Sequence, residues 1–432
     1  MKTIFYPLKE TWDDLCKRPV TDTSGFDTAV RAILNRVRSE GDEALRYYSE
    51  KFDSVKITDL KVTEGELNES EKAIKPELKN AIITAMENIK KFHESQLVDE
   101  DPIETTPGVK CWRKRVPVEK AGLYIPGGTA PLFSTVLMLG VPARIAGCRQ
   151  VILCTPPGKD GKINPLILFA AKLTGITDIY MTGGAQAIAA MAYGTESIPG
   201  VDKIFGPGNQ YVTKAKEIVS SDGVAIDMPA GPSEVLVIAD SKADPAFIAA
   251  DLLSQAEHGT DSQVVLLTDS RDLIVPVMDE LKIQLERLPR RAIATQSLEK
   301  SLSIVFQDMK DCIDFSNIYA PEHLIINTEN ADKLAENVVN AGSVFIGKFS
   351  CESAGDYASG TNHTLPTNGS ARSYSGVSTD SFLKKITFQE ITREGITRLG
   401  PVIELMAEAE GLEGHKNAVS VRLQGKAVKG EL

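Results

Sequence analysis

Four of the five histidines in this sequence lie in its second half, beside carboxylates, amides and glycines. Imidazole nitrogen is both a common metal ligand and a group that exchanges protons near neutral pH. Because histidine is so scarce here, its clustering next to acidic groups indicates a functional site. The chemistry it favours is a metal-held substrate with a general base beside it. The four are His258, His323, His363 and His415.

The segment DPAFIAADLLSQAEHG predicts a helix whose last turn carries two candidate ligands. Asp244 would cap this helix, Pro245 would open it and Gly259 would end it. Gln255 and His258 are three residues apart, so both project from one face at the helix C-terminus, where the negative end of the dipole favours a cation. The alternative is an ordinary helix end at which a protonated histidine caps carbonyl groups.

The segment PEHL places a carboxylate and an imidazole side by side at the entrance of an apolar strand. Neighbouring strand residues face opposite ways, so Glu322 and His323 reach one cavity only if this step lies on the loop before the strand. Two adjacent titratable groups suit a reaction with two proton-transfer steps. A solvated pair on a loop is the alternative.

A third candidate segment, GDYASGTNHTLPT, joins Asp356 and His363 through a glycine-rich stretch. Residues 350–380 have little periodicity, which predicts a long functional loop or a disordered one. A permissive backbone can bend both side chains toward one ligand. Disordered linkers rarely combine Tyr, His and Asp in this way, so we favour the functional loop.

Three glycine motifs, GLYIPGG, TGGAQA and FGPGNQ, punctuate the middle of the chain. Two of them follow predicted strands and precede helices, where backbone amides attract phosphate groups. None matches the dinucleotide fingerprint GxGxxG, and tight turns of an α/β protein are the alternative. The segment IDMPAGPSEVLV adds Ser233 as a polar group just before a strand.

Strand and helix patterns alternate from residue 151 onward, which predicts parallel sheets covered on both faces by helices. The strand candidates are VILCTP, DIYMTG, DKIFGP, EVLVIAD, QVVLLTD, LSIVFQD, HLIINT and GSVFIG. Residues 26–97 are helical in pattern, with His93 expected to be solvated or half-buried at the end of a helix that opens at Pro76. Two α/β units are expected, either sequential or with one inserted into the other.

Composition limits the class of protein. The chain has 432 residues and a net charge of −11 without a long Lys/Arg run, so it should not bind nucleic acid. Neither a signal peptide nor a membrane-spanning segment is recognisable, which predicts a soluble, cytoplasmic protein. The six cysteines form no CxxC pair, so a metal should be held by nitrogen and oxygen.

The tail from residue 381 to the end is too small for a core of its own and must dock onto the main body or onto a second subunit. It contains one clear helix pattern, PVIELMAEAEG, with Pro401 expected in the first turn and Gly411 as the cap.

In this order the motifs resemble those of the histidinol dehydrogenase family, from about residue 25 to the C-terminus. The motifs that carry the resemblance are YIPGG, TGGAQAIAA, FGPGN, DMPAGPSE, QAEHG, PEHL, SAGDYASGTNHTLPT and EGLEGH. The resemblance implies two consecutive NAD-dependent oxidations, from L-histidinol to L-histidinal and then to L-histidine, at the end of histidine biosynthesis.

The resemblance also implies a role for each candidate residue. His323 would be the base of both oxidation steps, and Glu322 would activate the water that hydrates the aldehyde. The remaining implied groups are as follows: one zinc ion per subunit on Gln255, His258, Asp356 and His415; substrate contacts from these ligands and from Ser233, His323, His363 and Glu410; and NAD contacts from Tyr124, Gln186 and Asn209.

For the fold, the resemblance implies two incomplete Rossmann-like domains and a homodimer whose tails cross, so that His415 completes the partner's zinc site. The implied parts are an N-terminal extension (1–24), a first domain with the zinc and catalytic residues (25–120 and 239–380), a second, NAD-binding domain (121–238) and a dimerisation tail (381–432).

Two rival functions remain open from the sequence. One is a related zinc- and NAD-dependent dehydrogenase of another small alcohol, against which Ser233, His363 and Glu410 argue. The other is a zinc hydrolase in which Glu322 activates a metal-bound water and no dinucleotide is needed. A non-catalytic binding protein is disfavoured, because it has no use for adjacent acid and base groups.

Overall fold

The computed structural model describes residues 1–18, 24–127, 131–228 and 231–425. Gly128 of the motif GLYIPGG and residues 229–230 of DMPAGPSE lie outside these ranges. The chain divides into two compact units: Met1–Gln96 with Val118–Phe382, and Leu97–Pro117 with Leu383–Leu432.

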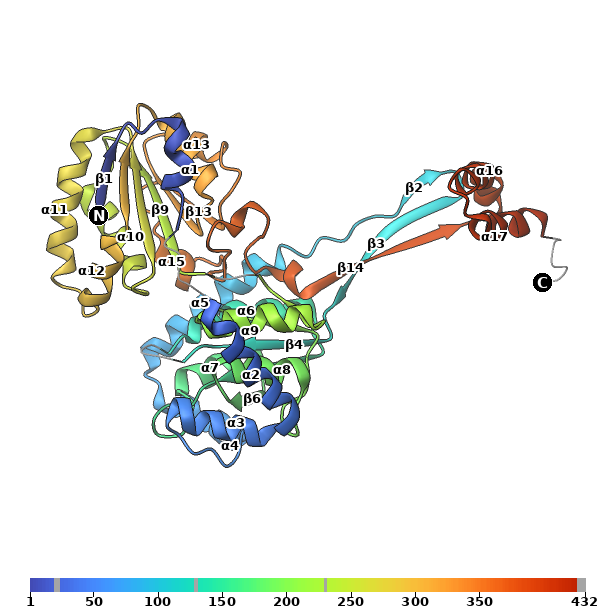
Figure 1. Cartoon of the computed structure of the whole chain (residues 1–432), viewed down its shortest axis with the longest axis horizontal. Helices are drawn as coiled ribbons and strands as arrows, with labels where there is room; N and C mark the ends of the chain where they lie inside the picture. Colours follow the sequence, from blue (N-terminus) through green and yellow to red (C-terminus); the bar gives the residue numbers. More distant parts are fainter. Residues whose placement is uncertain (19–23, 128–130, 229–230, 426–432) are drawn as a thin grey trace. The chain divides into compact units, whose positions relative to one another are not determined.

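The first unit contains a six-stranded parallel sheet in the order β1-β11-β10-β9-β12-β13. Successive side chains of a strand alternate between its faces. Val235 and Val237 of β9 therefore pack with α10, α11 and α12, whereas Leu236 and Ile238 pack on the other face with α1 and α13 (Figure 1). The strands are β1 (Lys2–Phe5), β9 (Glu234–Ala239), β10 (Gln263–Thr268), β11 (Leu302–Val305), β12 (His323–Asn327) and β13 (Ser343–Ile346). The helices around it are α1 (Trp12–Leu15), α10 (Pro245–Ala256), α11 (Ile274–Leu285), α12 (Arg291–Glu299), α13 (Met309–Tyr319), α14 (Ala331–Ala335) and α15 (Glu352–Tyr357).

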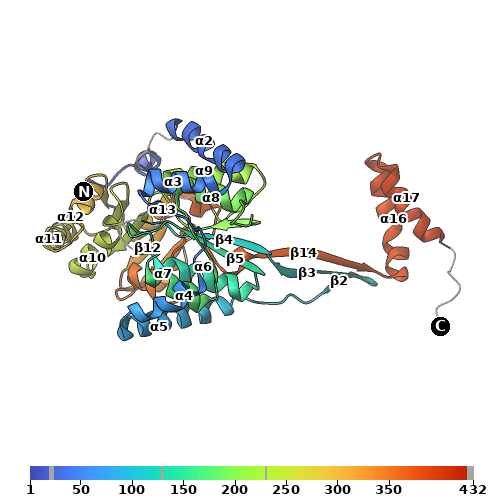
Figure 2. The ribbon, with the colours of Figure 1, turned by 90° about the horizontal axis from the view of Figure 1, so that it is seen from below.

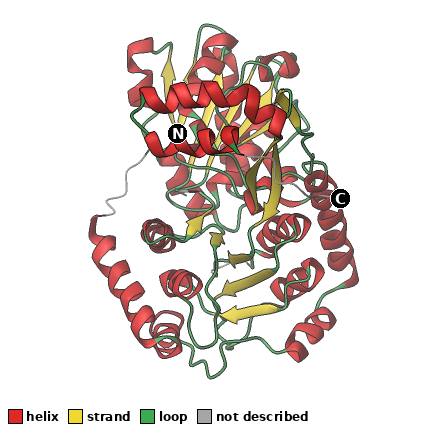
Figure 3. Cartoon of the chain, turned by 90° about the vertical axis from the view of Figure 1, so that its right-hand side faces the viewer, coloured by secondary structure: helices red, strands yellow, loops and turns green. Residues whose placement is uncertain are grey.

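A second parallel sheet in the same unit has the order β6-β5-β4-β7-β8. Helices α2, α3, α8 and α9 lie on one side of it and α4 to α7 on the other (Figure 2). The strands of both sheets thus run between helical layers, as Figure 3 shows. The strands are β4 (Lys120–Tyr124), β5 (Gln150–Thr155), β6 (Asp178–Met181), β7 (Lys203–Phe205) and β8 (Ala225–Ile226). The helices are α2 (Ser24–Glu40), α3 (Asp42–Tyr48), α4 (Glu64–Glu69), α5 (Pro76–Glu94), α6 (Phe133–Ala146), α7 (Pro165–Thr174), α8 (Gly184–Tyr193) and α9 (Gln210–Ser221).

The two sheets are interleaved along the chain. Strand β1 precedes the second sheet in sequence and β9 follows it, yet both belong to the first sheet. The second sheet is therefore an insertion. The N-terminal helices α2 and α5 pack against helices of this inserted sheet, α2 on α8 and α9, and α5 on α6. The prediction of an α/β protein with parallel sheets covered on both faces is confirmed.

Residues 350–380 differ from the expected long loop. They include α15, which carries Asp356, and two short 3₁₀ turns. The expected loop position of Asp356 was wrong, because the glycine beside it stands inside a helical turn that packs tightly on β13, where Gly355 faces the ring of Phe345. The short segments of the chain are η1 (Lys9–Thr11), a π turn η2 (Ser49–Asp53), η3 (Ser70–Ala73), η4 (Arg271–Leu273), η5 (Ser370–Arg372) and η6 (Thr379–Phe382).

The second unit is an antiparallel sheet in the order β14-β3-β2, followed by two helices that pack on each other. Its elements are β2 (Ile103–Thr106), β3 (Val109–Pro117), β14 (Leu383–Ile391), α16 (Arg393–Ala409) and α17 (Glu413–Gln424). The prediction that Pro401 opens the tail helix was wrong, because the Thr392 side chain caps the helix two turns earlier by accepting from the Gly395 amide. Gly411, at φ +71°, follows the end of this helix as expected.

Among the described residues, no helix combines the length and apolar character that crossing a membrane requires.

Candidate active site

Glu322 and His323 lie at the start of β12, and both are buried, with exposed fractions of 6% and 3%. The pair is held by one residue of the neighbouring strand β9. The backbone N–H of Glu234 donates to the Glu322 carboxylate over 2.8 Å, and Nδ1 of His323 lies 3.1 Å from the Glu234 carbonyl oxygen. The alternative, a solvated pair on a loop, is therefore wrong.

The contact with the Glu234 carbonyl determines which nitrogen of His323 can react. A carbonyl oxygen only accepts hydrogen bonds, so Nδ1 carries a proton and Nε2 is the atom that exchanges one. Nε2 is buried, has no hydrogen-bond partner among the described residues and lies 3.4 Å from Oδ1 of Asp356. Burial alone would lower the pKa of His323, but Glu352, Glu322 and Asp356 together raise it to about 10. Burial raises the pKa of Glu322 to about 8, against the opposing effect of His323.

The side chain of Glu234 is itself fixed in place. Arg18 donates to its two carboxylate oxygens over 2.8 and 2.9 Å, and the Asn368 N–H donates over 3.1 Å. The guanidinium group of Arg18 also lies over the ring of Tyr319, 3.7 Å from its centre. This buried ion pair connects Arg18 to the start of β9, the strand whose backbone contacts Glu322 and His323.

Helix α10 delivers Gln255 and His258 as expected. Asp244 caps its start by accepting from the Ala246 N–H, and the helix ends at Ala256. Gln255 is fully buried, and neither atom of its side-chain amide has a hydrogen-bond partner within the described part of the chain. His258 is exposed to solvent on one side, yet desolvation by the surrounding chain lowers its pKa, opposed by Asp356.

Helix α15 and the loop after it bring Asp356 and His363 together. Nδ1 of His363 lies 2.9 Å from the Asp356 carbonyl oxygen, so it donates there, and Nε2 lies 3.1 Å from the Thr135 hydroxyl. Burial lowers the pKa of His363. Thr135 belongs to α6 of the inserted sheet, so His363 links the two sheets of this unit.

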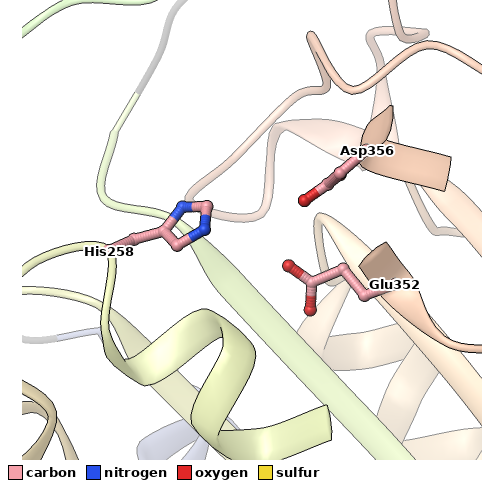
Figure 4. A group of neighbouring side chains, drawn as sticks. All are labelled: His258, Glu352 and Asp356. Carbon is pink, nitrogen blue, oxygen red and sulfur yellow. The ribbon is translucent and has the colours of Figure 1, made fainter. Parts of the chain in front are cut away.

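Glu352 is the site residue that the sequence reasoning missed. Its carboxylate lies with His258 and Asp356 in a group whose ligand atoms are all within 4.8 Å of one another (Figure 4). The available signal was its spacing: Glu352 and Asp356 are four residues apart, which puts both on one face of a helix. The prediction of a loop over residues 350–380 gave no reason to expect Glu352 and Asp356 on one helix face.

The cavity beside the site joins the two sheets. It has a volume of about 700 Å³ and is lined by Ser233, His258 and Asn368 together with Asn209, which caps α9. A larger cavity of about 990 Å³ lies at the opposite, amino-terminal edge of the inserted sheet and contains none of the expected site residues. We place the site at the smaller cavity, because Ser233 and His258 line it and the backbone of Glu234, the residue after Ser233, contacts the buried acid and base.

The residues expected to contact NAD stand at the carboxyl edge of the inserted sheet. Tyr124 ends β4, and its buried hydroxyl accepts from the Gly184 N–H at the start of α8. Gln186 lies in the first turn of α8, and its buried carbonyl oxygen has no hydrogen-bond partner among the described residues. Asn209 lies at the start of α9, after β7.

Glu410 and His415 belong to the second unit. Glu410 caps the C-terminus of α16, and His415 lies in the first turn of α17.

This geometry defines an α/β protein with a buried imidazole–carboxylate pair beside a group of side chains that could hold a metal ion, an arrangement that suits an enzyme that moves protons. Residues 16–423 match the family model of histidinol dehydrogenase. The chain is 60% identical over 423 residues to histidinol dehydrogenase of Bacteroides thetaiotaomicron, covering 98% of this chain and 99% of the relative. It is 52% identical to that of Aliivibrio fischeri, covering 95% and 94%. The crystal structure of histidinol dehydrogenase from Elizabethkingia anophelis matches with a TM-score of 0.97 at 56% identity, covering 98% of each chain. The chain belongs to the histidinol dehydrogenase family and is an oxidoreductase.

Proposed function

We propose that this protein oxidises L-histidinol to L-histidinal and then to L-histidine, using zinc and two NAD, as the last step of histidine biosynthesis. Family membership supports the substrate, and one observation carries the chemistry. A buried carboxylate just before β12 and a buried imidazole at its first residue stand side by side, with Nε2 of the imidazole 3.4 Å from Asp356. Converting an alcohol into an acid removes two hydrides and adds one water. The hydride steps need a base for the hydroxyl proton, and the addition of water needs a base for the water proton.

The donor set fits a zinc ion. Gln255, His258 and Asp356 offer an amide oxygen, an imidazole nitrogen and a carboxylate oxygen, which leaves room for further ligands. The fully buried amide of Gln255 has no partner in the described chain, and such a group is costly unless something binds it. When bound, zinc would polarise and orient the substrate, and NAD would accept the hydride.

The two residues of the pair then divide the proton transfers. After losing the proton that the neighbouring carboxylates hold on it, Nε2 of His323 takes the hydroxyl proton of the alcohol as the C–H hydride leaves. The protonated His323 gives this proton to the aldehyde oxygen while Glu322 takes a proton from the water that adds to the carbonyl carbon, which gives a neutral hydrate. His323, after releasing its first proton, takes a hydroxyl proton of the hydrate in the second oxidation. The Glu234 backbone orients both groups, so neither has to reorganise between steps.

The expected NAD site is supported by position. In parallel sheets ligands bind outside the carboxyl ends of the strands, where helix N-termini favour phosphate groups. Tyr124, Gln186 and Asn209 stand at that edge, and Asn209 shares a cavity with the substrate candidates Ser233 and His258. His363 would contact the substrate from the Asp356 side.

The second unit supports a homodimer. Its helices and the turn between them expose large apolar side chains, and a second copy of the chain would cover them. The exposed residues are Val402, Leu405, Met406, Leu412 and Val421. In this proposal His415 serves as the fourth zinc ligand and Glu410 as a substrate contact in the partner's site.

The decisive experiment measures NADH formed per histidinol consumed, with and without a chelator. A ratio near two that the chelator abolishes would support the proposal. No turnover of histidinol, in a panel that includes other small amino alcohols, would refute it.

A further inference from the structure

Glu352 presents a problem that the proposed ligands leave unsolved. Its side chain is 1% exposed, and neither carboxylate oxygen has a hydrogen-bond partner among the described residues. A buried carboxylate without donors is strongly unfavourable, because no protein or solvent group replaces its hydration. A cation bound to this carboxylate would compensate for its charge.

His323 does not provide that compensation. Its Nδ1 is 3.9 Å from the nearest Glu352 oxygen, beyond hydrogen-bonding distance, and already contacts the Glu234 carbonyl at 3.1 Å. The same imidazole faces the carboxylates of Glu322 and Asp356 as well. One imidazole is therefore shared among three buried carboxyl groups.

The helix that carries Glu352 adds a second argument. On α15, Glu352 and Asp356 are four residues apart, a spacing at which two like charges repel and destabilise the helix. The helix nevertheless packs tightly on β13, because a side chain at Gly355 would collide with the ring of Phe345, the nearest ring atom lying 2.6 Å from the added carbon. Close packing thus holds both carboxylates on the same side, facing His258 (Figure 4).

The geometry points to Glu352 as a carboxylate ligand of the divalent cation in the substrate-free enzyme, together with His258 and Asp356. This inference rests on the proposed function, because it assumes that the site binds zinc. The three side chains offer ligand atoms within 4.8 Å of one another, and a dication between them compensates both carboxylates of α15 at once. Substrate nitrogen atoms would compete with Glu352 for the same ion.

The test compares Glu352→Gln with Glu257→Gln in the full-length, metal-free protein without substrate. Glu257 is the residue before His258, so its variant removes the same charge next to a ligand but outside the converging group. Zinc affinity is measured by competition with a chromophoric chelator, and coordination is followed by the visible absorption of bound Co²⁺. Thermal unfolding of the metal-free proteins provides the third measurement.

We expect Glu352→Gln to weaken zinc binding by more than about 100-fold, beyond the loss typical of residues that only support a ligand. We also expect it to change the Co²⁺ spectrum and to leave the metal-free protein at least as stable as the wild type. Glu257→Gln should bind zinc like the wild type.

Two results would overturn the inference. One is zinc binding by Glu352→Gln equal to that of Glu257→Gln. The other is weaker binding with an unchanged Co²⁺ spectrum, which would make Glu352 a positioning residue. If the wild type itself takes up no zinc, the metal requirement of the proposed function fails as well, so the two failures are distinguishable.

Discussion

Glu322 and His323 are adjacent in sequence but are held by different atoms of Glu234. The amide of Glu234 orients the carboxylate, and its carbonyl selects the tautomer of the imidazole. The two side chains can therefore be tested separately, because replacing one leaves the contact of the other in place.

His323→Asn should abolish both oxidation steps while zinc remains bound. The residue supplies the base and no proposed metal ligand, and loss of a general base typically costs about 10²–10⁴-fold in rate. Single-turnover rates with histidinol and with histidinal, and metal analysis of the purified variant, check this expectation. Retention of either step at the wild-type rate would contradict it.

Glu322→Gln should slow oxidation of the aldehyde far more than oxidation of the alcohol. The glutamine side chain can still accept from the Glu234 N–H, so the local geometry persists, but it cannot take a proton from water. Rates measured separately with histidinol and histidinal distinguish the two steps. An equal loss in both would remove the proposed division between the two residues.

At the scale of elements, the two sheets contribute opposite ends of their strands to the proposed active site. The acid and base stand at the amino end of β12, while the expected NAD residues follow the carboxyl ends of β4, β6 and β7. Ligands usually bind at the carboxyl ends of parallel strands, and the expected NAD site of the inserted sheet follows this rule. Beside the first sheet, the C-terminal end of α10 carries the proposed metal ligands, where the negative end of the helix dipole would favour a bound cation.

The start of β9 depends on the buried pair between Arg18 and Glu234. We expect Arg18→Met to lower the free energy of unfolding by about 3–5 kcal/mol, because it leaves a buried carboxylate without its partner. It should also reduce kcat more than it raises KM, since Glu234 orients both members of the pair. Lys17→Met is the matched control for stability, because Lys17 is exposed and, among the described residues, its ion pair is with Asp14 at the surface. Equal stability of the two variants would contradict this role.

Helix α5 carries a pH-sensitive contact. His93 was expected to be solvated or half-buried but is fully buried, donating from Nδ1 to the Ile89 carbonyl, with Nε2 lying 3.4 Å from the Asn362 amide nitrogen. Burial lowers its pKa from the ordinary value of 6.5, so the unfolded chain binds the proton more readily. Stability from this group is complete above pH 6.5 and is lost as the pH falls below it.

The free energy of unfolding of the wild type should therefore fall more steeply below pH 6.5 than that of His93→Gln. The difference in slope should approach about 1.4 kcal/mol per pH unit at most, the value for one proton. Urea unfolding at several pH values measures both slopes. Identical slopes would show that His93 does not titrate differently in the folded state.

At the scale of the whole molecule, the proposed zinc site needs two chains. His415→Asn should weaken zinc binding, and so should Asp356→Asn. Mixed dimers of the two variants would contain one site with both residues intact. We expect refolded mixtures to recover about a quarter of wild-type activity, the statistical share of intact sites.

Each variant refolded alone is the control for this experiment and should stay inactive. A mixture no more active than the separate variants would mean that each site draws on a single chain, and the shared site would have to be abandoned.

Much of the fold was predictable because secondary structure follows local pattern. Apolar runs such as those of β9 and β10 are short and continuous, and Asp244 caps α10 as predicted, although the helix ends at Ala256, three residues before Gly259. The same helical periodicity places His93 on the buried face formed by Ile82, Ala85 and Ile89, so the sequence pattern also predicts its burial. The predicted position of Pro401 in the helix was wrong, because proline is common in the first turn of a helix and its position alone does not reveal the two turns before it.

The sequence by itself determined eight strands of the two parallel sheets, helices such as α5 and α10, and the adjacency of Glu322 and His323, since these depend on neighbours along the chain. Only the tertiary structure decided that strand β9 would orient that pair through backbone atoms, and that Arg18 would secure Glu234 across 216 positions. It also brought Glu352 to His258 and Asp356. Backbone groups carry no residue identity, and the approach of distant segments depends on sheet order and close packing, so neither is written in any local pattern.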